Sequence, residues 1–452
     1  MIDQHDFRPL LIPRLSMMMF LQFFAWGTWF STLGKALTNN DLGSVIGSAY
    51  MSAPIAAIFA PLFLGLVADR FFSSERVMGT LMLVGSGIMY FIPAIAEKGA
   101  ESGTLFTWLV LAYMLCYMPT LGLSNTIAFT HIPSQDKFPA IRVWGTIGWI
   151  AAGLVVGFTG WDGTFHIFRL AAVSSLALGI YCFMLPHTPP PLRGKPMDLR
   201  SLFMVDAFKL LGEWNYLIFA VCSTLICVPL AWYHGAGSQF LDQTGFRATG
   251  ATLTLGQMSE IIFMLLIPFF FRRLGVKVML LVGMAAWVGR FLLFSYGAPQ
   301  QVTWMLLLAV IMHGICYDFF FVTGFIYTDQ KAPKEIRGQA QSLLVFLTQG
   351  LGMFLGFKLM GNGVSTVEST QFAGAITAGL KDEPPIGFAD TFSNMFARAL
   401  PESLDRTNLA ATMEQWQSFW LKPAALAAIV AVLFAVLFWD KTKSIEAGKP
   451  DS

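Results

Sequence analysis

Three polar side chains lie near the middle of a long apolar stretch, residues 302–328. They are His313, Tyr317 and Asp318. An ionised carboxylate at the centre of a bilayer costs about 2.5–3.5 kcal/mol on insertion scales, so it is expected to face the protein interior or a water-filled cavity. The side chains of successive residues in a helix point about 100° apart, so Asp318 cannot face the same side of the helix as Tyr317. We expect His313 and Tyr317 to face a bound substrate, and Asp318 to lie at the cavity edge, where its protonation is coupled to closure.

A second carboxylate, Glu260, lies near the centre of another apolar stretch, and Gln257 precedes it by three residues. Residues three apart are neighbours on one face of a helix. A buried glutamate can accept hydrogen bonds from hydroxyl groups or carry a proton, whereas a structural hydrogen bond between helices is the alternative. His234 is either a hydrogen-bond partner for a substrate or a packing residue. Arg290 lies nearer the end of its segment and is expected to extend toward the membrane surface.

A third group, Arg142, Thr146 and Trp149, is spaced so that one helical face carries all three side chains. Arginine offers several hydrogen-bond donors, threonine adds a further polar contact, and tryptophan presents a flat apolar surface to a ring. The spacing therefore suits the binding of a polar molecule that contains a ring. For Arg142, the alternative is an anchor at the cytoplasmic end of its helix.

The composition indicates a polytopic membrane protein. Of the 452 residues, 55% are hydrophobic and only 12% are charged, whereas a soluble protein has about 25% charged residues. The net charge of +2 gives no basic excess that would suggest a nucleic-acid partner. The five cysteines all fall in apolar stretches, which favours buried packing residues over a disulfide framework or metal ligands.

A helix needs about 20 apolar residues to cross a bilayer, and the apolar stretches predict an all-α fold with twelve transmembrane helices in two six-helix bundles. The predicted spans are residues 15–37, 44–68, 77–96, 104–131, 139–160, 164–186, 214–240, 249–271, 276–297, 302–328, 338–362 and 417–439. Residues 1–187 would form the N-terminal bundle, 188–213 a proline-rich cytoplasmic linker, and 214–440 the C-terminal bundle. This bundle would include an external loop at about 364–415 with one or two short helices, followed by a cytoplasmic tail at 441–452.

The loops indicate an orientation and an internal repeat. Lysine and arginine concentrate in short loops on one predicted side, while the other side has little beyond Lys35, Lys98 and Arg247. The positive-inside rule therefore predicts that both termini are cytoplasmic. The two halves of the chain also contain similar loop sequences, because IPSQDKFPAIR at 132–142 corresponds to TDQKAPKEIR at 328–337. Parallel six-helix repeats are typical of transporters that rock two bundles about a central site.

Four residues after the second predicted span resemble a signature of the major facilitator superfamily. They are Gly65, Asp69, Arg70 and Arg76. The glycine that usually follows the acid–base pair is replaced here. The resemblance implies a conformational switch on the cytoplasmic face, in which ion pairs of Asp69 with basic neighbours break and form again.

Within that superfamily, several stretches are similar to the nucleoside:proton symporter family. The matching stretches are LQFFAWGTWFSTLG (21–34), YMPTLGLSNTI (117–127), FPAIRVWGTIGW (138–149), GQMSEIIFMLLIPFF (256–270) and YDFFFVTG (317–324). The resemblance implies the major facilitator fold, nucleoside and proton as partners, and a set of substrate-binding residues. Together with the spacing arguments above, the expected substrate-binding set is Arg142, Thr146, Trp149, His234, Gln257, Glu260, His313 and Tyr317, with Asp318 and Glu260 for proton coupling.

This chain departs from the family pattern at several of these positions. The family more often has phenylalanine in place of Trp149, and tyrosine and phenylalanine in place of His313 and Tyr317. It tends to carry amides at the positions of Ala231 and His234. These departures predict a larger stacking surface and a more polar pocket in this chain.

We therefore expect a proton-coupled secondary transporter that imports nucleosides by alternating access. It would be a monomer surrounded by lipid in the bacterial inner membrane. No GxxxxGK[ST] loop, metal-ligand spacing or Ser-His-Asp pattern occurs, so neither a cofactor nor an enzymatic activity is expected. The alternatives are a proton symporter for a sugar or another polar solute, and a non-transporting receptor whose loop at 364–415 binds a partner.

Overall fold

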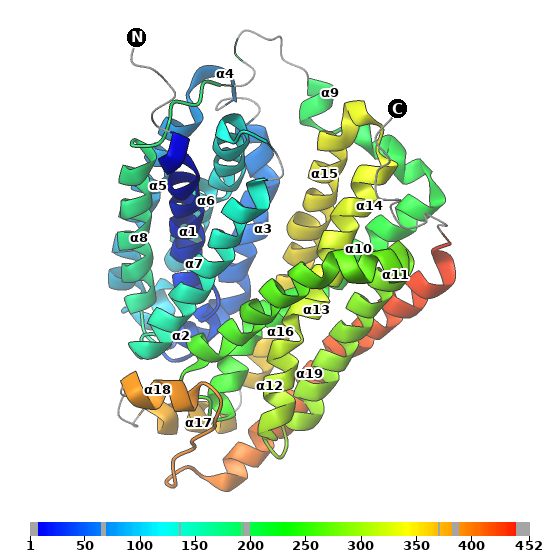
Figure 1. The fold of residues 1–452 in the computed structure, drawn as a ribbon. Helices are drawn as coiled ribbons and strands as arrows, with labels where there is room; N and C mark the ends of the chain where they lie inside the picture. Colours follow the sequence, from blue (N-terminus) through cyan, green and yellow to red (C-terminus); the bar gives the residue numbers. More distant parts are fainter. Residues whose placement is uncertain are drawn as a thin grey trace. The chain divides into compact units, whose positions relative to one another are not determined.

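The computed structural model describes residues 8–64, 69–134, 137–190, 193, 199–368, 371–381 and 388–439. Over these residues the chain is helical, without a strand (Figure 1). Ten helices of the described part are long and apolar enough to cross a membrane. One of them, α11 (Thr249–Gly297), is two helices joined at Gly275, which has φ 68° and ψ 177°. Together with the shorter apolar helix α8 (His166–Cys182), the described helices give the predicted set of twelve spans.

Most helix bounds lie within a few residues of the predicted spans. The remaining α-helices up to α10 are α1 (Arg8–Phe30), α2 (Leu33–Thr38), α3 (Ile46–Phe63), α4 (Asp69–Phe71), α5 (Ser74–Ala96), α6 (Gly103–His131), α7 (Phe138–Phe158), α9 (Leu199–Leu202) and α10 (Trp214–Gln243). Those after α11 are α12 (Thr303–Ile311), α13 (His313–Tyr317), α14 (Thr323–Lys331), α15 (Arg337–Val345), α16 (Met353–Glu368), α17 (Gln371–Lys381), α18 (Phe388–Asn394) and α19 (Arg406–Leu437). Short 3₁₀ turns η1 (Gly43–Val45), η3 (Gly99–Ser102), η5 (Ala207–Gly212) and η7 (Lys334–Ile336) connect some of them.

The final helix begins earlier than its apolar stretch. α19, drawn in orange to red in Figure 1, starts at Arg406, eleven residues before the predicted span at 417. The side chain of Asp405 accepts a hydrogen bond from the backbone nitrogen of Thr407 at 2.8 Å and so caps the helix. Leu409 and Met413 are buried along this polar beginning. The predicted external loop is correspondingly shorter, and it contains the short helices α17 and α18.

Two of the later spans contain π-helical turns. η6 (Asp318–Val322) lies between α13 and α14, and η8 (Phe346–Gly352) lies between α15 and α16. A π turn holds one residue more than an α turn, and such turns are frequent at functional sites. Asp318, the carboxylate that the sequence singled out, is the first residue of η6.

The helices divide into two compact units. The first combines the described part of the N-terminal half with His234–Thr254 and Phe357–Leu404. The second contains Leu199–Tyr233, Leu255–Gly356 and the described chain from Asp405 onward.

In the first unit, close packing of α1 on α7 depends on glycine. A Cβ atom on Gly148 would lie 2.3 Å from the backbone oxygen of Phe20, a distance that no side chain can adopt. Gly27 similarly lies against Trp149, because a Cβ atom on Gly27 would be 3.1 Å from the Trp149 Cα atom. The two helices therefore lie close enough for the aromatic side chains of α1 to contact those of α7.

In the second unit, part of the predicted linker is helical. Ala207 of η5 is buried in an apolar cluster with Ala332, Ala340 and Leu343. Nearby, the ammonium group of Lys209 donates a hydrogen bond to Asp206 at 2.8 Å. This bond lowers the pKa of the Asp206 carboxyl below its usual value.

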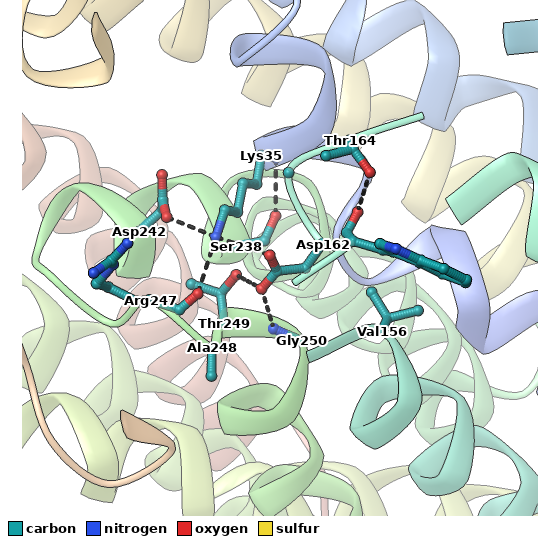
Figure 2. A network of polar contacts seen from close by, with 12 residues as sticks. Lys35, Val156, Asp162, Thr164, Ser238, Asp242, Arg247, Ala248, Thr249 and Gly250 are labelled. Carbon is teal, nitrogen blue, oxygen red and sulfur yellow. Dashed lines mark hydrogen bonds and ion pairs between the residues drawn. The ribbon is translucent and has the colours of Figure 1, made fainter. Parts of the chain in front are cut away.

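A buried network of charges lies inside the first unit (Figure 2). The ammonium nitrogen of Lys35 is 3.1 Å from Asp162 Oδ1 and 2.7 Å from Asp242 Oδ1. It also donates to the backbone oxygen of Arg247 at 3.3 Å. The Lys35 side chain is only 7% exposed, so this residue is a buried ion-pair partner rather than a solvated loop charge.

The second oxygen of Asp162 is also satisfied. Oδ2 accepts hydrogen bonds from the Thr249 hydroxyl at 2.8 Å and from the Gly250 backbone nitrogen at 3.1 Å. A buried ion pair is tolerated when its remaining hydrogen-bonding atoms are satisfied in this way. The network thus ties α2, the turn after α7, the end of α10 and the start of α11 together within one unit (Figure 2).

We predict that Lys35→Met strongly destabilises the protein. Removing one partner of a buried ion pair costs about 3–5 kcal/mol, because the remaining charge is uncompensated. The apparent Tm of the purified protein, followed by tryptophan fluorescence, is expected to fall by several degrees. Adding Asp242→Asn to this variant should recover part of the loss, since one orphaned carboxylate is removed. Lys98→Met, at an exposed lysine, is the control and should leave the Tm unchanged; equal Tm values for Lys35→Met and the wild type would contradict the prediction.

Candidate binding site

Part of the predicted binding set lies in the first unit around Phe30. The Trp149 ring centroid is 6.1 Å from that of Phe30, and the His234 ring is 5.8 Å from it. Trp149 also meets Trp26 edge-on at 5.3 Å. The structure therefore brings Trp149 and His234, from α7 and α10, to the same aromatic group.

Arg142 and Thr146 occupy the turns of α7 that precede Trp149. The Arg142 guanidinium carbon is 4.1 Å from the centroid of the Phe23 ring, a cation–π contact. Thr146 is 8% exposed. Arg142 as a whole is half-buried.

The aromatic group is held by hydrogen bonds to the backbone of α1. The Tyr50 hydroxyl donates to the Phe30 oxygen at 2.7 Å, and its ring meets the Phe30 ring at 5.1 Å. The Tyr117 hydroxyl donates to the Gln22 oxygen at 2.7 Å. These contacts fix the positions of the rings that Trp149 and His234 approach.

The remaining members of the predicted set lie in the second unit. His313 Nε2 is 4.0 Å from Glu260 Oε2, and the His313 and Tyr317 ring centroids are 5.6 Å apart. Gln257, one turn before Glu260 on α11, is 8% exposed. The structure therefore brings Glu260 of α11 to His313 of α13, whose ring lies beside that of Tyr317.

Ser259 joins α11 to the break between α12 and α13. Its hydroxyl donates to the Ile311 oxygen at 2.6 Å and accepts from the Gly314 nitrogen at 3.0 Å. A Cβ atom on Gly314 would lie 2.6 Å from the Ser259 carbonyl carbon, so only glycine permits this approach. Sequence reasoning missed Ser259, because a serine in an apolar stretch gives no charge signal.

Asp318 is fully buried. Its exposed fraction is 0%, and neither carboxylate oxygen has a hydrogen-bond partner among the described residues. A buried carboxylate without a partner is costly when ionised. Asp318 is also the first residue of η6, where the helix geometry changes locally.

The expectation that Arg290 extends toward the membrane surface is wrong. Its side chain is 0% exposed, and Nη1 is 3.0 Å from His313 Nδ1. The guanidinium carbon is 3.3 Å from the centroid of the Tyr233 ring. Position along an apolar stretch cannot reveal such a partner. The rarity of ionisable residues within spans would have singled it out.

The predicted switch residues are described only in part. Gly65 lies outside the described residues. Asp69 and Arg70 belong to the short helix α4, and Arg76 is exposed on α5. The buried acid of this region is Glu75, which accepts from the Thr188 backbone nitrogen at 3.0 Å.

Comparisons with known proteins agree on one family. A family model described as Nucleoside H+ symporter matches residues 11–377. The putative nucleoside transporter YegT of Escherichia coli K12 is 38% identical over 449 residues, which cover 97% of this chain and 96% of YegT. The nucleoside permease NupG of E. coli K12 is 32% identical over 369 residues, which cover 78% of this chain and 87% of NupG. A crystal structure of a NupG variant matches with a TM-score of 0.79 and 28% identity, covering 95% of this chain and all of that chain.

The twelve-span pattern and the match to a solved transporter define the class, a multi-pass membrane transporter with the major facilitator fold. The chain belongs to the nucleoside H+ symporter family, and it is a proton-coupled nucleoside transporter rather than an enzyme. The fold and the transport activity expected from the sequence are confirmed, and the sugar alternative is not favoured.

We predict that Trp149→Ala weakens nucleoside binding. Stacking of a base on an aromatic side chain contributes about 1–3 kcal/mol. The KM for uptake of labelled uridine or adenosine into proteoliposomes should therefore rise roughly 5- to 150-fold. Trp149→Phe should retain most of the affinity. Trp144→Ala, at a 44% exposed position on the same helix, is the matched control; a KM for Trp149→Ala equal to that of this control would refute a stacking role.

Proposed function

We propose that this chain imports nucleosides together with protons across the bacterial inner membrane, and that its predicted polar residues bind the cargo and the proton. The observation that carries the proposal is Asp318, a carboxylate buried in a membrane span with no partner among the described residues. A structural role would require a partner, whereas proton exchange does not.

The residues around Phe30 suit the nucleoside base. Trp149 provides a flat surface, and His234 adds a ring that can form hydrogen bonds. Arg142, half-buried and about two turns before Trp149 on α7, supplies donors for a hydroxyl or carbonyl oxygen. Thr146, between these two, adds a polar contact.

In the second unit, the residues around His313 offer hydrogen-bonding groups. Glu260 can accept hydrogen bonds from sugar hydroxyls, and its side chain is 14% exposed. Gln257 lies on the same face of α11, one turn before it. Tyr317 is half-buried beside His313 and can both donate and accept.

Asp318 couples the proton to the conformational cycle. A neutral, protonated Asp318 is compatible with its buried position, while an ionised one requires water or a cation. Proton binding and release therefore favour different arrangements of the π turn that it begins. Glu260 is the second candidate for carrying the proton.

The driving force is adequate for accumulation. One proton crossing a potential of about 100 mV contributes about 2.3 kcal/mol. This supports roughly fifty-fold accumulation of a neutral nucleoside at one proton per cargo molecule. The distribution of lysine and arginine favours a cytoplasmic location for both termini, and we expect a monomer of two six-helix bundles, residues 1–187 and 214–440.

We predict that Asp318→Asn binds nucleoside but does not accumulate it. The amide cannot exchange a proton, so a gradient of one pH unit, worth about tenfold accumulation per proton, should have no effect. Labelled uridine or adenosine is followed in proteoliposomes, under an imposed proton gradient and in counterflow without a gradient. Counterflow should persist while gradient-driven accumulation is lost.

Asp329→Asn is the control on the same span. Asp329 pairs with Arg337 at 3.4 Å and its side chain is 49% exposed, so both assays should match the wild type. Accumulation by Asp318→Asn at the wild-type level would show that another residue carries the coupling. Absence of uptake of every nucleoside tested by correctly folded wild-type protein would overturn the proposed function as a whole.

A further inference from the structure

The contact between Arg290 and His313 restricts the protonation state of the histidine ring. A guanidinium group has only hydrogen-bond donors. Since Arg290 Nη1 is 3.0 Å from His313 Nδ1, this ring nitrogen must be the acceptor and carries no proton. The neutral ring then holds its proton on Nε2, the nitrogen that lies 4.0 Å from Glu260 Oε2.

Arg290 is held firmly enough to impose this arrangement. It is fully buried, with its guanidinium carbon 3.3 Å from the Tyr233 ring centroid and 5.4 Å from that of Trp287. Its Nε and Nη2 atoms have no well-placed acceptor among the described residues, so the guanidinium is oriented there by its bond to His313 and by the aromatic rings. A planar guanidinium packed on aromatic faces keeps a fixed direction, unlike a flexible ammonium group.

The arrangement also compensates charge. Arg290 and Glu260 carry opposite charges on either side of the His313 ring. In surroundings of low dielectric constant, a second positive charge on His313 would be repelled by Arg290. His313 Nε2 lies 4.0 Å from Glu260 Oε2, so the Nε2–H group is on the side of the ring that faces this carboxylate, away from Arg290.

We propose that Arg290 is a positioning residue for nucleoside binding: it acts through His313, keeping the Nε2–H group of the neutral ring directed toward an acceptor oxygen of the cargo. The inference rests on the proposed role of His313 in binding and extends it to a residue of a different helix. The recognised chemistry is a hydroxyl or carbonyl oxygen of the nucleoside. Without Arg290, His313 would distribute between tautomers, and only one of them presents this donor.

A double-mutant cycle tests the proposal. Arg290→Met removes the guanidinium group at similar volume, and the KM for labelled nucleoside uptake should rise about tenfold while kcat changes less than threefold. Arg290→Lys, which can still donate to Nδ1, should recover part of the affinity. The second background is His313→Gln. Its side-chain amide can donate near the Nε2 position and has no tautomers. Adding Arg290→Met to His313→Gln should therefore change KM less than twofold. Arg169→Met, at an exposed arginine paired with Glu97, is the control with unchanged kinetics.

A spectroscopic measurement separates positioning from a structural effect. In ¹⁵N spectra of histidine-labelled protein, the signals lost in His313→Gln identify His313. They should report a protonated Nε2 and an unprotonated Nδ1 in the wild type and for the larger part of Arg290→Lys, and a mixture of tautomers in Arg290→Met. An equal rise in KM in both backgrounds, a fall in kcat at unchanged KM, or an unchanged tautomer in Arg290→Met would each overturn the proposal. Loss of uptake in the wild type and in Arg169→Met would instead contradict the proposed function.

Discussion

The cost of placing charge in a bilayer governs the polar residues of this transporter. Two carboxylates and a backbone oxygen compensate the charge of Lys35. A hydrogen bond to an imidazole and contacts with aromatic faces stabilise the charge of Arg290. Asp318 has no partner of either kind among the described residues. The first arrangement suits a fixed charge. Under the roles proposed above, the second would suit a directed donor and the third an exchangeable proton.

The low polarity of the bilayer also constrains the backbone conformation. Hydrogen-bonding groups of a broken helix need partners where water is absent. At the break after α12, Ser259 of α11 supplies both a donor and an acceptor. At η6 the helix keeps its own bonds in a wider turn. His313 and Asp318 therefore lie on segments whose geometry departs from a regular helix, although every span remains helical.

Hydropathy predicted the spans well because lipid requires about 20 apolar residues in each of them. It failed at Arg406, where a cap and a few buried side chains begin α19 in polar sequence. It also misjudged Lys35 and Arg290, since a position along an apolar stretch says nothing about which other segments lie beside it. Their partners lie more than 120 and about 20 residues away along the chain, respectively. Only the folded arrangement shows that these charges are compensated.

The contact between Gly314 and Ser259 has an evolutionary consequence. Any side chain at 314 would collide with the backbone of residues 259 and 260, whose nearest atoms lie 2.6–2.7 Å from the Cβ position. Replacing Ser259 by alanine would leave the Ile311 oxygen and the Gly314 nitrogen without their shared partner. Gly314 should therefore persist whatever residue stands at 259, and Ser259 should be replaced only by a residue that keeps a hydroxyl group, as descendants of this gene diverge.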